Sequence, residues 1–200
     1  MTCIVGIVDD GVVWMGGDSA GVCGYSITSR RDPKVYRVGE FLFGYSGSFR
    51  MGQVLGYGFA PPHHGEFIDV DRYMRTVFID ALRATLKGAG FAQNNSGTEE
   101  ISGAFLVGYR GRIFCVEPDY QVAERLDAFD AIGCGSDIAL GSLYATKDIT
   151  PPDRITAALE AAEYFNGGVK GPFVIERTPK QLGAGKASAF PITDNNNEKA

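Results

Sequence analysis

Residues 1–20 read MTCIVGIVDDGVVWMGGDSA, and this stretch decides the fold that the rest of the chain completes. It holds two apolar runs rich in β-branched residues, 3–8 and 12–17, which are separated by Asp9-Asp10-Gly11. Turn residues between two such runs are typical of a β-hairpin. Because neither run alternates with polar residues, we expect both faces of this hairpin to be buried.

The remaining strand candidates also occur mainly in pairs. The expected strands are 34–38 and 41–45, 103–109 and 112–117, and a final strand at 172–177. Apolar residues at three- and four-residue spacing predict helices at about 49–58, from Asp69 to Gly88, at about 137–146, and from Thr150-Pro151 to Asn166.

This order of elements predicts an α+β fold. Hairpins that alternate with pairs of helices favour a four-layer αββα sandwich, in which two antiparallel sheets are covered by helices. The chain has 200 residues and no internal repeat or linker, so we expect one domain over residues 1–200. The small, polar residues from about 180 onward predict a loose tail.

Composition excludes several classes of function. The formal net charge of -5 and the scattered basic residues give no surface for nucleic acid or an anionic membrane. No stretch approaches the roughly 18 apolar residues of a membrane span, and no signal peptide follows Met1, so we expect a cytoplasmic protein. The four cysteines form no C-x-x-C pair and lie away from the histidines, which indicates reduced thiols and no metal site.

The position of Thr2 raises the question of catalysis. The only histidines, His63 and His64, are adjacent in a Pro-rich loop, so a hydrolase that uses histidine as its base is disfavoured. Initiator methionine is normally removed before a small residue, and we therefore expect the mature chain to begin with Thr2. Its α-amine, with an ordinary pKa of about 7.7–8.0, suits a general base, and a threonine hydroxyl with its own amine is a known nucleophile and base pair.

Such a site needs a cation beside the hydroxyl and a carboxylate that holds the cation. Asp18 follows the second strand, and Lys34 opens the third, so both lie at strand ends in the hairpin set that carries Thr2. A surface ion pair, or two unrelated charges, is the alternative that spacing alone leaves open.

The N-terminal stretch resembles the proteasome β-type threonine peptidases of the N-terminal nucleophile hydrolase superfamily, and most of all the HslV-like peptidases. Members have a mature N-terminal Thr, an Asp sixteen positions later and a Lys thirty-two positions later, which Thr2, Asp18 and Lys34 match. The segments 44–48 (GYSGS) and 131–136 (AIGCGS) also resemble family segments.

The resemblance implies roles for these residues. Thr2 is nucleophile and base, Lys34 tunes the amine, Asp18 orients Lys34, and the Gly47 N–H stabilises the oxyanion. Tyr45 lies at the S1 pocket, which receives the side chain before the cleaved bond. The chain departs from the family pattern at three positions. Cys134 replaces a Ser, Glu163 replaces an Asp, and Asn166 replaces a Ser. We expect Glu163 and Asn166 to supply polar contacts similar to those of the family residues.

The resemblance further implies a homo-oligomeric ring that encloses its sites, peptide or unfolded-protein substrates, a separate ATPase unfoldase and no cofactor. Two alternatives remain: an N-terminal nucleophile amidase that acts on a small-molecule amide, and a catalytically silent homologue that only assembles.

Overall fold

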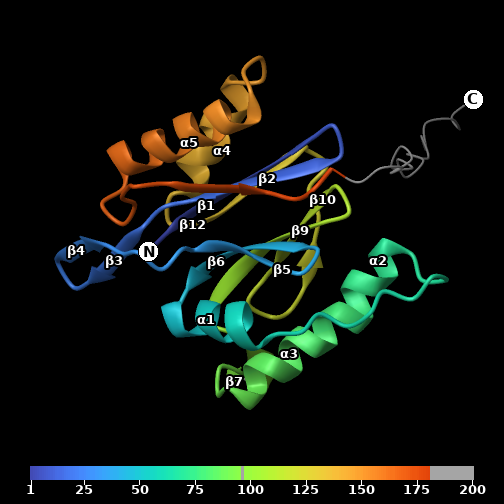
Figure 1. Cartoon of the computed structure of the whole chain (residues 1–200). Coiled ribbons are helices and arrows are strands. Elements are labelled where there is room, and N and C mark those ends of the chain that lie inside the picture. Colours follow the sequence, from blue (N-terminus) through green and yellow to red (C-terminus); the bar gives the residue numbers. More distant parts are fainter. Residues whose placement is uncertain (96, 181–200) are drawn as a thin grey trace, which may run out of the picture.

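The computed structural model describes residues 1–95 and 97–180 (Figure 1). The loose tail expected from about residue 180 lies outside the described residues. The described chain is a mixed α+β fold with antiparallel sheets and helices, as the sequence predicts. None of its described helices has the length and hydropathy needed to cross a membrane.

One sheet contains the N-terminal hairpin. Its strand order is β12-β1-β2-β13, and all neighbouring strands are antiparallel. The bounds are β1 (Cys3–Asp9), β2 (Val12–Gly17), β12 (Phe129–Gly133) and β13 (Val174–Arg177). In this register Cys3 lies opposite Gly133, and Ile4 lies opposite Gly17.

The second sheet faces the first. Its order is β11-β10-β9-β6-β5, again antiparallel throughout. The bounds are β5 (Val35–Val38), β6 (Phe41–Gly47), β9 (Gly103–Tyr109), β10 (Arg112–Val116) and β11 (Val122–Ala123). Apolar side chains of both sheets, among them Ile4, Met15 and Leu42, fill the space between them.

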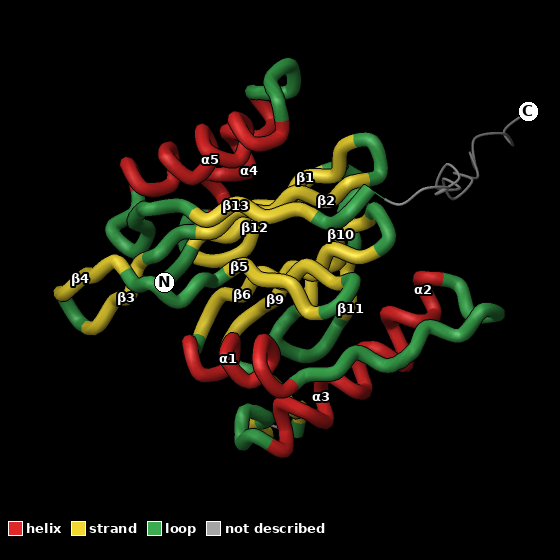
Figure 2. Tube along the Cα trace, in the orientation of Figure 1, coloured by secondary structure: helices red, strands yellow, loops and turns green. Residues whose placement is uncertain are grey.

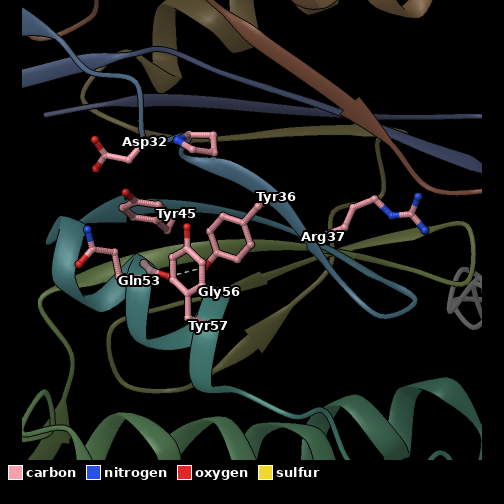
Figure 3. A pocket seen from close by; sticks show the side chains of 9 residues that line it. Asp32, Tyr36, Arg37, Tyr45, Gln53, Gly56 and Tyr57 are labelled. Atoms are coloured by element: carbon pink, nitrogen blue, oxygen red, sulfur yellow. Dashed lines mark hydrogen bonds between the residues drawn. The ribbon is translucent and has the colours of Figure 1, made fainter.

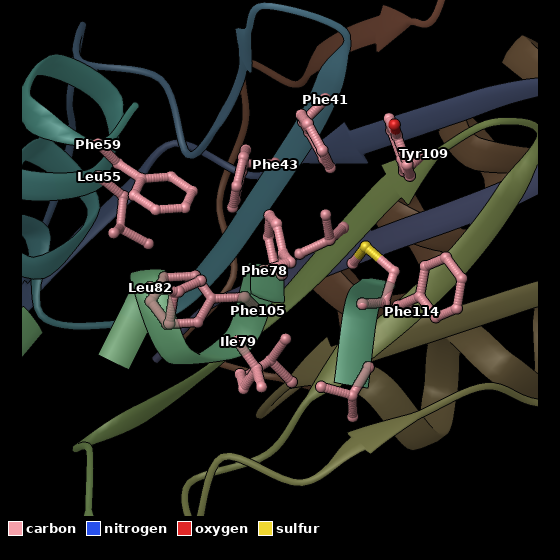
Figure 4. Close-up of a cluster of buried hydrophobic side chains, with 14 of the residues drawn as sticks. Phe41, Phe43, Leu55, Phe59, Phe78, Ile79, Leu82, Phe105, Tyr109 and Phe114 are labelled. Carbon is pink, nitrogen blue, oxygen red and sulfur yellow. The ribbon is translucent and has the colours of Figure 1, made fainter. Parts of the chain in front are cut away.

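Helices pack on the outer faces of both sheets (Figure 2). The helices are α1 (Phe49–Gly58), α2 (Val70–Tyr73), the π-helical turn η1 (Met74–Phe78), α3 (Ile79–Gly88), α4 (Ser136–Ala145) and α5 (Pro151–Phe165). Leu159 of α5 packs with Val5 of β1, whereas Leu55 of α1 and Leu82 of α3 pack with Phe43 of β6. Figure 4 shows the cluster to which Leu55, Leu82 and Phe43 belong, which is rich in aromatic rings.

Both faces of the N-terminal hairpin are buried, which confirms that prediction. Cys3, Val5 and Ile7 pack toward α4 and α5, while Ile4 packs toward the other sheet. This alternation is the period-two geometry of a strand between two apolar layers. Position 16 of β2 requires a glycine, because a Cβ there would collide with Ile155 of α5.

The structure adds elements that the sequence reading left out. These are β12, β11 and two small hairpins, formed by β3 (Ala20–Cys23) with β4 (Ser26–Ser29) and by β7 (Gln93–Asn95) with β8 (Thr98–Glu100). The helix expected from Asp69 to Gly88 is an α-π-α succession, because the π-helical turn η1 interrupts it.

Candidate active site

Thr2 lies immediately before β1 and is 1% exposed. Because β12 pairs with β1, the turn that follows β12 lies beside it. The Thr2 backbone N–H donates to Cys134 Sγ at 3.2 Å, and its carbonyl accepts from the Gly135 N–H at 3.3 Å. The Thr2 hydroxyl donates to the Met1 carbonyl oxygen. The Thr2 nitrogen is therefore held by the Cys134 side chain and the Thr2 carbonyl by the backbone of the turn after β12, whereas the hydroxyl contacts Met1.

Asp18 and Lys34 form a fully buried ion pair. Lys34 Nζ lies 2.9 Å and 3.0 Å from the two Asp18 oxygens, and the side chains are 1% and 0% exposed. Asp18 also accepts from the Cys3 and Ala20 N–H groups, both at 2.9 Å. Since Cys3 follows Thr2 in the chain, Asp18 fixes Lys34 to the backbone directly beside Thr2. The alternative of a surface ion pair is wrong.

Burial sets the electrostatics of Lys34. Desolvation lowers its pKa below the ordinary value, and the charge and hydrogen bonds of Asp18 act in the opposite direction. An ammonium in this position acts on its surroundings through a poorly screened field, because water does not reach it. Asp18 is the group that keeps such a buried cation in place.

Cys134 and Asn166 form a polar pair next to Thr2. Cys134 Sγ lies 3.3 Å from Asn166 Oδ1, and Asn166 Nδ2 donates to the Cys134 carbonyl at 2.7 Å. Asn166 Oδ1 also accepts from the Gly168 N–H at 2.9 Å. The turn after α5 is thereby joined to the turn after β12, and Thr2 lies against this junction.

Glu163 makes no hydrogen bond to Thr2 or Cys134 in the part of the chain that the structure describes. Its Oε1 accepts from the Gly171 N–H at 3.0 Å, in the loop that leads from α5 to β13. The preceding residue of this loop, Lys170, places its N–H 3.4 Å from Asp18 Oδ2, and its carbonyl accepts from the Ser19 N–H at 2.8 Å. Glu163 thus acts on the site only through the loop that borders Asp18.

The two thiols near Thr2 differ in environment. The Cys3 side chain is buried in the core, and burial raises its pKa to about 12, so this thiol stays protonated. Cys134 is exposed. Within residues 1–95 and 97–180 there is no group of three or more His, Cys, Asp and Glu side chains arranged to hold a metal ion.

Gly47 is the last residue of β6. Its φ of 126° is unfavourable for residues with a side chain. The neighbouring Ser46 lies against the turn at Gly133, because a Cβ built on Gly133 would be 3.2 Å from Ser46 Oγ and would collide with the Thr2 carbonyl. The end of β6 therefore approaches the start of β1 from the other sheet.

Tyr45 is 2% exposed and lines a pocket of about 220 Å³ (Figure 3). Its ring lies on Gly52 of α1, where any Cβ would collide with it. Its N–H donates to the Lys34 carbonyl at 3.1 Å, which joins β6 to the residue that precedes β5. The other lining residues are Asp32, Pro33, Tyr36, Arg37, Gln53, Gly56 and Tyr57.

Two residues that the sequence does not mark, Arg30 and Phe49, also pack near Lys34. The Arg30 guanidinium lies 3.9 Å from the centroid of the Phe49 ring, and Lys34 Nζ lies 5.6 Å from the same centroid. Arg30 also donates to both Asp32 oxygens, at 2.9 Å and 2.7 Å. No local pattern marks these residues, because the contact joins the end of the unpredicted strand β4 to the first turn of α1.

Comparison with known proteins places this geometry among proteasome-like folds. No family model and no curated protein matches the sequence. Among solved structures, two of BPH from Thiobacillus denitrificans, one in complex with epoxomicin, match at a TM-score of 0.75 and 22% identity. They cover 90% of this chain and 100% and 99% of theirs. Eukaryotic HslV from Trypanosoma brucei matches at a TM-score of 0.62 and 15% identity, over 88% of this chain and 98% of its own. The chain therefore has the fold of the bacterial proteasome homologue BPH and of HslV, the proteasome β-type N-terminal nucleophile hydrolase fold.

Proposed function

We propose that this protein is a threonine peptidase whose nucleophile is Thr2, exposed by removal of Met1. The observation that carries the proposal is the buried Asp18–Lys34 ion pair, which Asp18 links to the backbone of the residue after Thr2. A fully buried pair of this kind is expensive to desolvate and adds little to stability, and such groups concentrate at functional sites.

The reaction follows from these positions. The Thr2 α-amine accepts the hydroxyl proton as Oγ attacks the substrate carbonyl carbon, and the Gly47 N–H stabilises the resulting oxyanion. When the intermediate collapses, the leaving amine takes the proton and an ester to Thr2 Oγ remains. Water, activated by the free amine, then hydrolyses this ester. The Lys34 cation favours the neutral amine and the alkoxide through its charge.

The other residues position these groups. Cys134 and Asn166 hold the Thr2 nitrogen in the turn after β12, and Glu163 supports the loop beside Asp18. The Tyr45 pocket serves as the S1 subsite.

The proposal extends to the whole chain and its assembly. Residues 1–200 form one proteasome β-like domain with a four-layer αββα sandwich, since helices pack on both sheets. Copies of the chain close into a ring around an inner chamber in the cytoplasm, and a separate ATPase supplies unfolded proteins. The fold shared with BPH and HslV supports this arrangement.

The intact mass of the purified protein, before and after incubation with epoxomicin, tests the proposal. A peptide epoxyketone reacts with both the hydroxyl and the free amine of an N-terminal threonine. We expect loss of Met1 and one adduct per chain, with no adduct in the matched Thr2→Ala variant. Retained Met1 without adduct would favour the catalytically silent homologue. Trimmed Met1 without adduct, together with turnover of small amides, would favour the amidase.

A further inference from the structure

The Asp18 carboxylate is contacted by a segment that lies far from it in the sequence. The loop between α5 and β13, residues 166–173, places the Lys170 N–H 3.4 Å from Asp18 Oδ2. The other donors to this carboxylate, the Lys34 ammonium and two backbone N–H groups, lie at 2.9–3.0 Å. The Lys170 contact is thus longer than these, and it depends on how the loop is held.

Ser19, which follows Asp18 in the chain, makes two hydrogen bonds to this loop. Its N–H donates to the Lys170 carbonyl at 2.8 Å, and its hydroxyl donates to the Pro172 carbonyl at 2.5 Å. The two carbonyls lie on either side of Gly171, so the hydrogen bonds hold the loop at two points. Ser19 is 4% exposed, and its hydroxyl contacts the loop in place of water. Ser19 therefore fixes the position from which the Lys170 N–H reaches Asp18.

Two other side chains hold the same loop from its exposed side. The Ser29 hydroxyl donates to the Gly171 carbonyl at 2.7 Å, and Glu163 Oε1 accepts from the Gly171 N–H at 3.0 Å. Both contacts are exposed, whereas Ser19 adjoins the ion pair of Asp18 and Lys34, whose side chains are almost completely buried. The loop held in this way occupies the side of Asp18 Oδ2 on which water would otherwise bind.

We infer that Ser19 is a positioning residue for the proposed reaction, because its hydroxyl holds the α5–β13 loop against Asp18 and so keeps water from the ion pair. The inference rests on the proposed peptidase function. A buried cation acts on a neighbouring group through a field that water does not screen. When the loop moves away, water reaches Asp18 and Lys34, and the effect of Lys34 on the Thr2 amine weakens.

The test compares full-length Ser19→Ala and Ser19→Thr with the wild-type protein, with kcat/KM measured for one fluorogenic peptide from pH 6 to 9. We expect Ser19→Ala to lower kcat/KM by about threefold to tenfold at pH 6.5, the range that one neutral hydrogen bond supplies. The loss is smaller at pH 8.5, because the midpoint of the profile moves up when water screens Lys34. Ser19→Thr keeps the hydroxyl and moves the profile back toward that of the wild-type protein.

Two further variants complete the design. Thr28→Val is the matched control, since it removes a hydroxyl of the β3–β4 hairpin that donates to the Gly21 carbonyl and not to the loop, and it keeps the wild-type profile. Ser29→Ala releases the loop at Gly171 instead of beside Asp18. We expect it to shift the profile in the same direction as Ser19→Ala, and it replaces that variant if Ser19→Ala does not fold.

Hydrogen–deuterium exchange of the Lys170 amide provides a measurement that does not depend on activity. We expect this amide to exchange about threefold to tenfold faster in Ser19→Ala than in the wild-type protein, and at the wild-type rate in Thr28→Val. Equal exchange in Ser19→Ala, or a loss of kcat/KM that is the same at every pH, overturns the role of Ser19 and leaves the peptidase proposal standing. If the wild-type protein neither cleaves the peptide nor takes the epoxomicin label, the peptidase proposal fails, and the positioning role fails with it.

Discussion

Replacing Asp18 with Asn removes the countercharge of Lys34 while keeping the size of the side chain. The Lys34 ammonium is then buried without a partner, and the amide oxygen cannot replace both carboxylate oxygens as acceptors for the Cys3 and Ala20 N–H groups. Breaking a buried ion pair by removing one partner costs about 3–5 kcal/mol. We expect a loss of this size in the free energy of unfolding at pH 7, together with loss of peptidase activity.

The pH dependence of the free energy of unfolding identifies the buried Lys34 ammonium as the cause of the stability loss in Asp18→Asn. In Asp18→Asn the pKa of Lys34 falls further below its ordinary value, because desolvation acts without the opposing charge. The unfolded chain then binds a proton that the folded chain lacks between the folded pKa and about 10.4, so stability rises with pH in that window. The deficit relative to the wild-type protein is complete below the folded pKa. Above it, and up to the folded pKa of Lys34 in the wild-type protein, which also lies below the ordinary value, the deficit shrinks by up to about 1.4 kcal/mol per pH unit.

Urea unfolding at pH 7 and pH 9.5, at one protein concentration, measures this change. The double variant Asp18→Asn/Lys34→Met is the matched control, since it has no buried ammonium and its deficit does not shrink with pH. A deficit below about 1 kcal/mol at pH 7, or one that is equal at both pH values, refutes the reasoning.

Three further predictions concern the reaction. Gly47→Ala forces a side chain onto a φ of 126° and against the Ser102 carbonyl. We expect it to lower kcat/KM by about 100-fold or more in a fluorogenic peptide assay. A loss below tenfold with unchanged circular dichroism contradicts the role of Gly47. Iodoacetamide inactivates the wild-type enzyme by alkylating Cys134, whose Sγ lies 3.2 Å from the Thr2 nitrogen, whereas Cys134→Ser keeps activity within about tenfold and resists the reagent. The kcat/KM of the wild-type enzyme rises with pH to a midpoint below about 7.7, because Lys34 lowers the pKa of the Thr2 amine; a flat profile from pH 6 to 9 argues against the amine as base.

Local sequence pattern was enough for the elements that have strong periodicity or clear turns. The hairpin of β1 and β2 and the helices α1, α4 and α5 fall where the pattern predicts them. Strand β12 was missed because Asp130 interrupts its apolar residues. This carboxylate is buried in the structure, 3.4 Å from Arg125, and burial raises its pKa. The contact that allows Asp130 to be buried in β12 comes from Arg125 in the preceding loop, and a short apolar strand pattern does not indicate such a contact.

The candidate site divides in the same way. Thr2, Asp18 and Lys34 have characteristic positions at strand ends, so sequence and resemblance together predict their convergence. The contact of Arg30 with Phe49 and the contact of Glu163 with Gly171 depend on how separate segments pack, and spacing cannot specify them.

The hydrogen bonds around Asp18 also govern when the site comes into being during synthesis. Thr2 and Asp18 leave the ribosome before Cys134 and the Lys170 backbone, which complete their surroundings and are separated from them by 132 and 152 positions. At about 5–20 residues per second, the interval from Asp18 to Lys170 takes roughly 8–30 s. A nascent or truncated chain therefore carries the nucleophile without its framework, and the full site forms only after nearly the whole described chain has been made and folded.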